Sequence, residues 1–63
     1  MNVKEAILRE KANILITDIY SVADEIDTYL NNTHKSKVDV AKAMKNVKLS
    51  YKVLEDELRN YKR

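Results

Sequence analysis

Side chains that could do acid–base chemistry are few in this 63-residue chain. The only histidine, His34, lies beside Thr33 and Ser36 in a polar stretch, and most carboxylates are distant along the sequence. Nucleophilic catalysis needs a base within hydrogen-bond reach of the nucleophile and a third group that orients the base. The sequence offers no such set, so we predict no catalytic residues and expect His34 to be a solvated turn residue.

Carboxylates recur at close helical spacing in two places, at Asp24 with Asp27 and in the run from Glu55 to Glu57. Metal sites in helical bundles use acids that project inward from several helices, usually with Glu-x-x-His motifs. This chain has no such motif, no cysteine and only one imidazole, so thiolate and zinc sites are excluded. It also has no glycine, which excludes phosphate-cradling loops. We therefore expect no metal, no cofactor and no enzymatic activity.

The element that would position these side chains in the first half is a long helix. Its apolar residues recur with alternating spacings of four and three, which is the seam of a heptad repeat. These residues are Leu8, Ala12, Leu15, Ile19, Val22, Ile26 and Tyr29. Asn2 can cap the start, with Glu5 three residues later. The pattern predicts a helix from about residue 3 to about residue 31.

The second half repeats the same spacing. Its apolar seam consists of Val40, Met44, Val47, Tyr51, Leu54, Leu58 and Tyr61. Ser36 precedes this seam, with Asp39 three residues on, which is the signature of a helix N-cap. Lys62 and Arg63 follow at the C-terminal end, where the helix dipole favours positive charge. The pattern predicts a second helix from about residue 37 to about residue 62.

A polar loop of about residues 31 to 36 separates the two helices. Asparagine readily adopts the left-handed conformation that closes a helix, so we expect it at Asn31 or Asn32. One continuous helix is the alternative, and the heptad phase argues against it because Tyr29 and Val40 are eleven residues apart. The sequence therefore predicts a single all-α domain, residues 1–63, folded as a two-helix antiparallel hairpin.

The charge distribution supports an antiparallel arrangement. Residues 1–32 carry three basic and six acidic side chains, a net charge of −3, while residues 33–63 carry nine basic and four acidic ones, a net charge of +5. A turn near residue 33 would place residue i opposite roughly residue 68 − i. Exposed ion pairs contribute only about 0.2 to 1 kcal/mol each, so they select register more than they stabilise the fold.

The small size of the chain predicts that one hairpin is not the complete structure. Chains of this length bury little apolar surface, and without disulfides or zinc the remaining stabilising device is oligomerisation. Apolar residues outside the seam could form a dimer or partner surface: Ile7, Ile14, Ile16, Tyr20, Leu30, Leu49 and Val53. Two hairpins would then pair as a four-helix bundle. The alternative is that these are scattered surface residues, which are common.

Basic residues form a candidate nucleic-acid surface on the second helix. They share one edge at helical spacing: Lys42, Lys45, Lys48, Lys52 and Arg59. A basic stripe can follow a phosphate backbone, but solubility alone also favours lysines on an exposed helix. The net charge of +2 is too small to make nucleic acid the default partner.

These observations favour a non-enzymatic homodimer that binds an unidentified protein as an inhibitor, adaptor or regulator. The alternatives are a nucleic-acid-binding dimer that uses the basic edge, and a structural unit that assembles with itself. The chain is rich in lysine and asparagine and lacks glycine and proline, as expected for a phage, plasmid or low-GC bacterial gene.

The expected compartment is the cytoplasm, with no membrane partner. No apolar run reaches the roughly 18 to 20 residues that span a bilayer, and the first residues lack the apolar region of a signal peptide.

Overall fold

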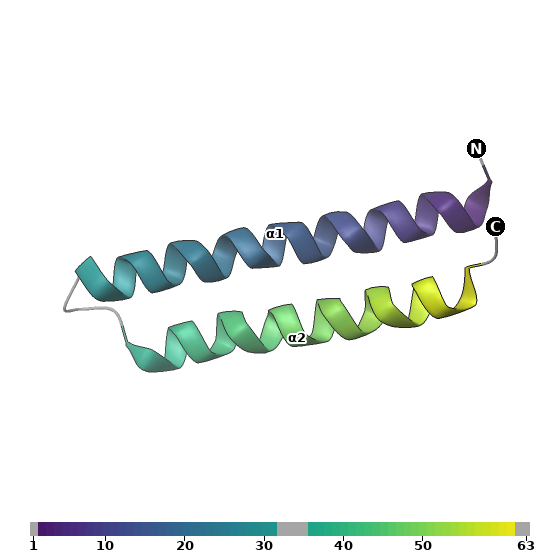
Figure 1. Cartoon of the computed structure of the whole chain (residues 1–63). Coiled ribbons are helices and arrows are strands. Elements are labelled where there is room, and N and C mark those ends of the chain that lie inside the picture. The colour runs from purple at the N-terminus through teal and green to yellow at the C-terminus, as the bar shows by residue number, and fades with distance from the viewer. Residues whose placement is uncertain (1, 32–35, 62–63) are drawn as a thin grey trace.

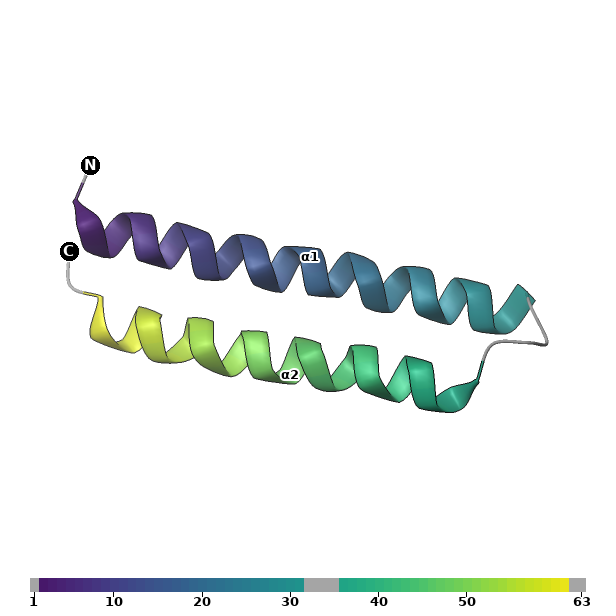
Figure 2. The same cartoon turned by 180° about the vertical axis from the view of Figure 1, so that it is seen from behind.

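The computed structural model describes residues 2–31 and 36–61, which form two helices. Helix α1 spans Val3–Asn31 and helix α2 spans Lys37–Asn60. The helices lie side by side and antiparallel, so that the first turn of α1 is next to the last turn of α2 (Figures 1 and 2). The predicted all-α two-helix hairpin is confirmed.

Side chains cap the start of each helix as the sequence predicted. Asn2 Oδ1 accepts a hydrogen bond from the backbone N–H of Glu5 at 2.7 Å. Ser36, with extended backbone angles, accepts one through Oγ from the N–H of Asp39 at 3.4 Å. Each cap satisfies a backbone donor that has no partner within the helix, so both predicted N-caps are confirmed.

The helix ends differ from the prediction in two respects. The left-handed conformation was expected at Asn31 or Asn32; no described residue has a positive φ angle, so it is not at Asn31, and Asn32 lies outside the described residues. The Asn31 side-chain amide instead donates to the backbone oxygen of Asp27 at 2.8 Å, which ties the last turn together. Helix α2 ends at Asn60, two residues earlier than predicted, where the N–H of Tyr61 donates to the Leu58 oxygen at 3.2 Å. The predictions for Asn32, His34, Lys62 and Arg63 fall outside the described residues.

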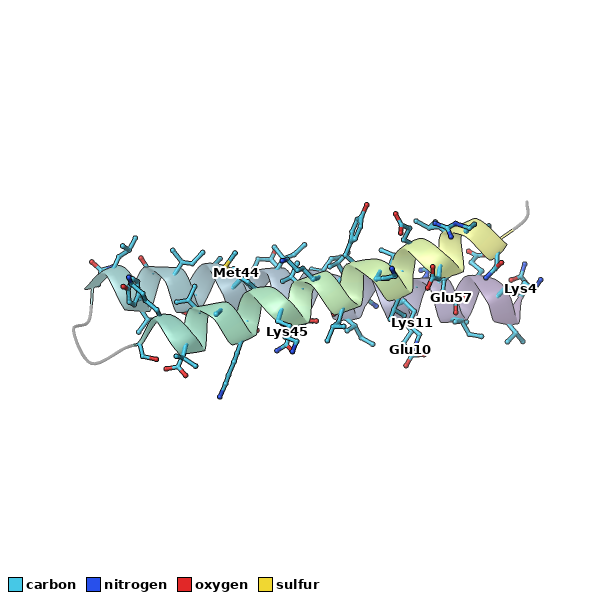
Figure 3. All side chains as sticks on the ribbon, turned by 90° about the horizontal axis from the view of Figure 1, so that it is seen from below. Lys4, Glu10, Lys11, Met44, Lys45 and Glu57 are labelled. Atoms are coloured by element: carbon cyan, nitrogen blue, oxygen red, sulfur yellow. The ribbon has the colours of Figure 1, made fainter. Side chains whose placement is uncertain are left out.

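A polar contact between the helices fixes their register. Ser50 Oγ donates a hydrogen bond to Asp18 Oδ2, and these two numbers fit the predicted pairing of residue i with residue 68 − i. The predicted register is confirmed. The same register places Lys11 opposite Glu57, and Figure 3 shows both toward the N-terminal end of α1.

Most of the predicted seam is partly buried, nine residues of the fourteen predicted. Residues spaced by seven on each helix are partly buried between the helices: Leu8, Leu15, Val22 and Tyr29 on α1, and Val40, Val47, Leu54 and Tyr61 on α2. These eight residues form the apolar layers of the hairpin seam. For them the heptad prediction is confirmed.

The intervening layers of the seam are not the predicted ones, and of the residues predicted there only Ala12 is partly buried. Between the apolar layers lie small or polar residues: Lys11, Asp18 and Glu25 on α1, and Ala43, Ser50 and Glu57 on α2. The predicted Ile19, Ile26, Met44, Tyr51 and Leu58 are instead exposed. Small side chains at Ala43 and Ser50 let α2 approach α1 closely at these layers, which bulkier neighbours would prevent. Both helices are therefore rotated so that large apolar residues point out of the seam.

The hairpin is thin and buries few side chains among the described residues. It measures 48 × 17 × 12 Å, and Ala43, at 9% exposure, is the only hydrophobic residue that is buried within residues 2–31 and 36–61. The chain exposes 5289 Å², whereas a compact monomer of its 7.4 kDa mass exposes about 4,200 Å². About 1,100 Å² more surface than expected is thus in contact with water.

Candidate binding surface

An apolar groove runs between the helices on one side of the hairpin. Its volume is about 490 Å³, and residues of both helices line it: Ile19, Val22, Ala23, Ile26, Met44, Val47 and Lys48. Ile19 is 51% exposed and Met44 is 49% exposed. These side chains belong to the predicted seam, yet they form the floor and walls of an open surface.

The apolar surface continues along both helices beyond the groove. Ile16 and Leu30 lie seven residues before and after Ala23, so they share its side of α1, and Leu30 is 74% exposed. The same interval leads from Met44 to Tyr51 on α2. We call this surface the apolar face; its residues are Ile16, Ile19, Ala23, Ile26, Leu30, Met44, Tyr51 and Leu58.

The opposite side of the hairpin is less apolar. Ile14 and Ile19 are five residues apart, which puts them about 140° apart around α1. Ile14 lines a hollow of about 200 Å³ whose other residues are Lys11, Leu49, Ser50 and Val53. A second hollow, of about 270 Å³, lies nearer Ser36 and is lined by Ser21, Glu25, Asp39, Lys42, Ala43 and Asn46. We call the residues of these two hollows, with Ile7, the mixed face.

The seven residues predicted as a dimer or partner surface do not form one patch. Ile14, Leu49 and Val53 come together on the mixed face, and Ile7 lies seven residues before Ile14. Ile16 and Leu30 lie on the apolar face. Tyr20, at 72% exposure, lies four residues after Ile16 and three before Ala23, so it borders the apolar face on the side of α1 that points away from α2.

The centre of the apolar face was not predicted from the sequence. Ile19, Ile26 and Met44 were assigned to packing within the hairpin, since their spacing fits a two-helix seam. The width of the apolar arc on α1 is the signal that could have found them, because an arc wider than one seam indicates contact with a further helix. In a four-helix bundle, such residues point at the bundle centre and not directly at the neighbouring helix.

The predicted basic edge lies on one side of α2, and its two outermost residues border the two faces. Lys42 lines the polar hollow of the mixed face, and Lys48 borders the apolar groove. Six residues separate them, which corresponds to about 120° around α2. Lys45 lies between them, and Figure 3 shows it on the edge of α2 opposite Met44.

Ion pairs close to the chain ends are local to each helix. Arg9 lies 3.4 Å from Glu5, and Arg59 lies 3.7 Å from Glu55 and 4.0 Å from Asp56. All five side chains are at least 40% exposed, so each pair contributes less than about 1 kcal/mol. Arg59, which belongs to the predicted basic edge, thus has two carboxylates beside it.

Two further observations concern metal ions and membranes. Among the described residues, no group of three or more His, Cys, Asp or Glu side chains could hold a metal ion. Neither described helix has a stretch long and apolar enough to cross a membrane.

Comparison with protein families, curated proteins and solved structures found no match for this chain. The fold and the surface define its structural class. It is an all-α helical hairpin with one broad apolar face and one mixed face.

Proposed function

We propose that this chain is a non-enzymatic homodimer that acts by binding another protein, as an inhibitor, adaptor or regulator. In this proposal a second copy covers the apolar face, and the mixed face binds the larger protein. The apolar face is the observation that carries the proposal, because large contiguous apolar patches on soluble proteins mark interaction sites. The expected compartment is the cytoplasm.

The exposed area supports a homodimer. Two separate chains of 5289 Å² each expose about 10,600 Å² together, while a compact body of twice the mass exposes about 7,000 Å². Pairing could therefore bury about 3,600 Å², which is in the range of obligate homodimers.

The mixed face supports binding of a different protein. Ile14, Leu49 and Val53 provide an apolar centre, and Lys11 and Ser50 border it with polar groups. An apolar centre with a polar rim is the usual anatomy of a non-obligate protein interface. Of the residues predicted from sequence, this assigns Ile7, Ile14, Leu49 and Val53 to the partner, and Ile16 and Leu30 to the second copy.

Thermal unfolding at several concentrations tests the homodimer. Association stabilises the folded chain by mass action, so Tm should rise as protein concentration increases from about 1 to about 100 μM. Circular dichroism of the helical signal would measure it. A Tm that does not change over this range contradicts the proposal.

A pull-down with matched baits tests partner binding. The wild-type chain should retain a protein that the variant Leu49→Asp/Val53→Asp does not retain, because charges would occupy the apolar centre of the mixed face. Both baits should remain dimers, since these positions lie outside the apolar face. Identical sets of retained proteins would count against the mixed face as a binding site.

A further inference from the structure

We infer, resting on the proposed homodimer, that α1 of the second copy stacks antiparallel on α1, with the dimer two-fold axis passing beside Ala23. The arrangement of apolar residues on α1 supports this geometry, in which the two α1 helices meet and Ala23 lies beside its own copy.

The apolar residues of α1 are distributed symmetrically about Ala23. They lie seven and four residues before it and three and seven residues after it: Ile16, Ile19, Ile26 and Leu30. An isologous interface pairs each residue with a position on the other side of its axis. An axis at Ala23 therefore sets Ile16 against Leu30 of the second copy, and Ile19 close to Ile26 of the second copy.

The alanine at the centre permits a close approach of the two α1 helices. Interaxial distances of packed helices run from about 8 to 10 Å, and small residues at the contact give the lower values. The larger isoleucines and leucine on either side of Ala23 then fill the space between the helices. The pairing covers Leu30, which is 74% exposed in the single hairpin.

Charge on α2 makes α1 the more central helix. Lys48 borders the groove, close to the level of Ala23 in the register of the hairpin. A two-fold axis at Ala23 would bring Lys48 near its own copy, and like charges repel. The α2 helices should therefore stand farther apart than the α1 helices.

The alternative stacking places α1 against α2 of the second copy. In this arrangement Ile16 and Ala23 would pack against the side of α2 that carries Lys48. The aliphatic part of the lysine side chain would then cover them. This arrangement therefore buries less apolar surface than contact between two α1 helices, and burial of apolar area is the main favourable contribution to association. Stacking of α1 on α1 also leaves both mixed faces outside, so the dimer presents two identical sites to a protein partner.

Single-cysteine variants test this geometry, because the natural chain has no cysteine. A disulfide needs Cα atoms within about 7 Å, a condition that only residues beside the axis meet with their own copies. Under mild oxidation Ala23→Cys should form a covalent dimer about tenfold faster than Ser21→Cys or Val53→Cys. The two controls are on the mixed face, and denaturant should abolish the difference.

Other outcomes overturn the inference in distinguishable ways. Faster crosslinking of Val53→Cys, with a dimeric mass in sedimentation, would put the second copy on the mixed face and leave the homodimer standing. Crosslinking of Ala23→Cys only when mixed with Lys48→Cys would show α1 stacked on α2. Absence of crosslinks together with a monomeric mass would remove the homodimer as well.

Discussion

The apolar face and the mixed face are built by the same two helices, but only the apolar face is continuous. Exposure of single residues does not separate them, since Ile19 is 51% exposed on the apolar face and Ile14 is 43% exposed on the mixed face. The difference lies in the neighbours. Ile19 has apolar residues around it in the groove, whereas Ile14 lies beside Lys11 and Ser50.

A hairpin can therefore satisfy its register and still leave its largest apolar side chains exposed. The Ser50–Asp18 contact and the small residue Ala43 fix the pairing of α1 with α2. Ile26 and Met44 remain exposed as a result. The seam specifies how the two helices meet and leaves the apolar face exposed.

The largest expected difference between the faces comes from one substitution on each. Ile19→Asp places a charge in the apolar face, and because an isologous dimer contains it twice, the dimer Kd should rise more than about a hundredfold. Ile14→Asp is the matched control and should change the Kd less than about threefold. Sedimentation velocity at several concentrations measures both. Equal weakening by the two variants would show that the faces are not different in function.

A smaller effect, on the free energy of unfolding, is expected from removal of the Ser50–Asp18 contact in the seam. Ser50→Ala removes the hydroxyl that donates to the Asp18 carboxylate, and the free energy of unfolding should fall by about 1 to 2 kcal/mol. A double-mutant cycle with Asp18→Ala should give a coupling of about 0.5 to 1.5 kcal/mol. Urea unfolding provides the free energies. Additive effects of the two substitutions would mean that the contact does not fix the register.

Removal of the N-cap of either helix should lower the free energy of unfolding by about 1 kcal/mol. Ser36→Ala deletes the acceptor for the Asp39 N–H, and caps of this type contribute about 0.5 to 2 kcal/mol. Asn2→Ala should cost less, because the first turn of a chain frays more readily. Denaturant midpoints of the two variants measure the order, and a larger loss at Asn2 would reverse it.

The smallest effect is expected from substitutions in the basic edge, measured as a change in nucleic-acid binding. Phosphate contacts by Lys45, Lys48 and Lys52 would give a log-log salt slope of about −0.9 per contact on duplex DNA. Because the net charge of the chain is only +2, we expect no binding below about 10 μM at physiological salt. Fluorescence anisotropy with the wild type and with a Lys45→Gln/Lys48→Gln/Lys52→Gln variant checks this. Tight, salt-sensitive binding that the variant loses would favour the nucleic-acid alternative.

Much of the fold could be predicted from the sequence because its determinants are local. The seven-residue spacing from Leu8 to Tyr29, together with the caps at Asn2 and Ser36, places both helices almost residue by residue. The turn between the halves and their opposite charges were enough to predict the register that Asp18 and Ser50 display.

The rotation of the helices could not be predicted in the same way. Ala43 and Met44 are adjacent, and a heptad pattern accepts either one as the inward position. The choice depends on how closely the two backbones approach and on how side chains interdigitate, which are properties of the assembled pair. The candidate site could not be predicted for the same reason, because the rotation of the helices decides that Ile19 and Ile26 face outward.

Sedimentation equilibrium of the wild-type chain at micromolar concentration tests the central claim most directly. If the apolar face binds a second copy, the mass should be twice the 7.4 kDa of one chain, and Ile19→Asp should return it to the single-chain value. A wild-type mass of 7.4 kDa throughout the concentration range would contradict the account.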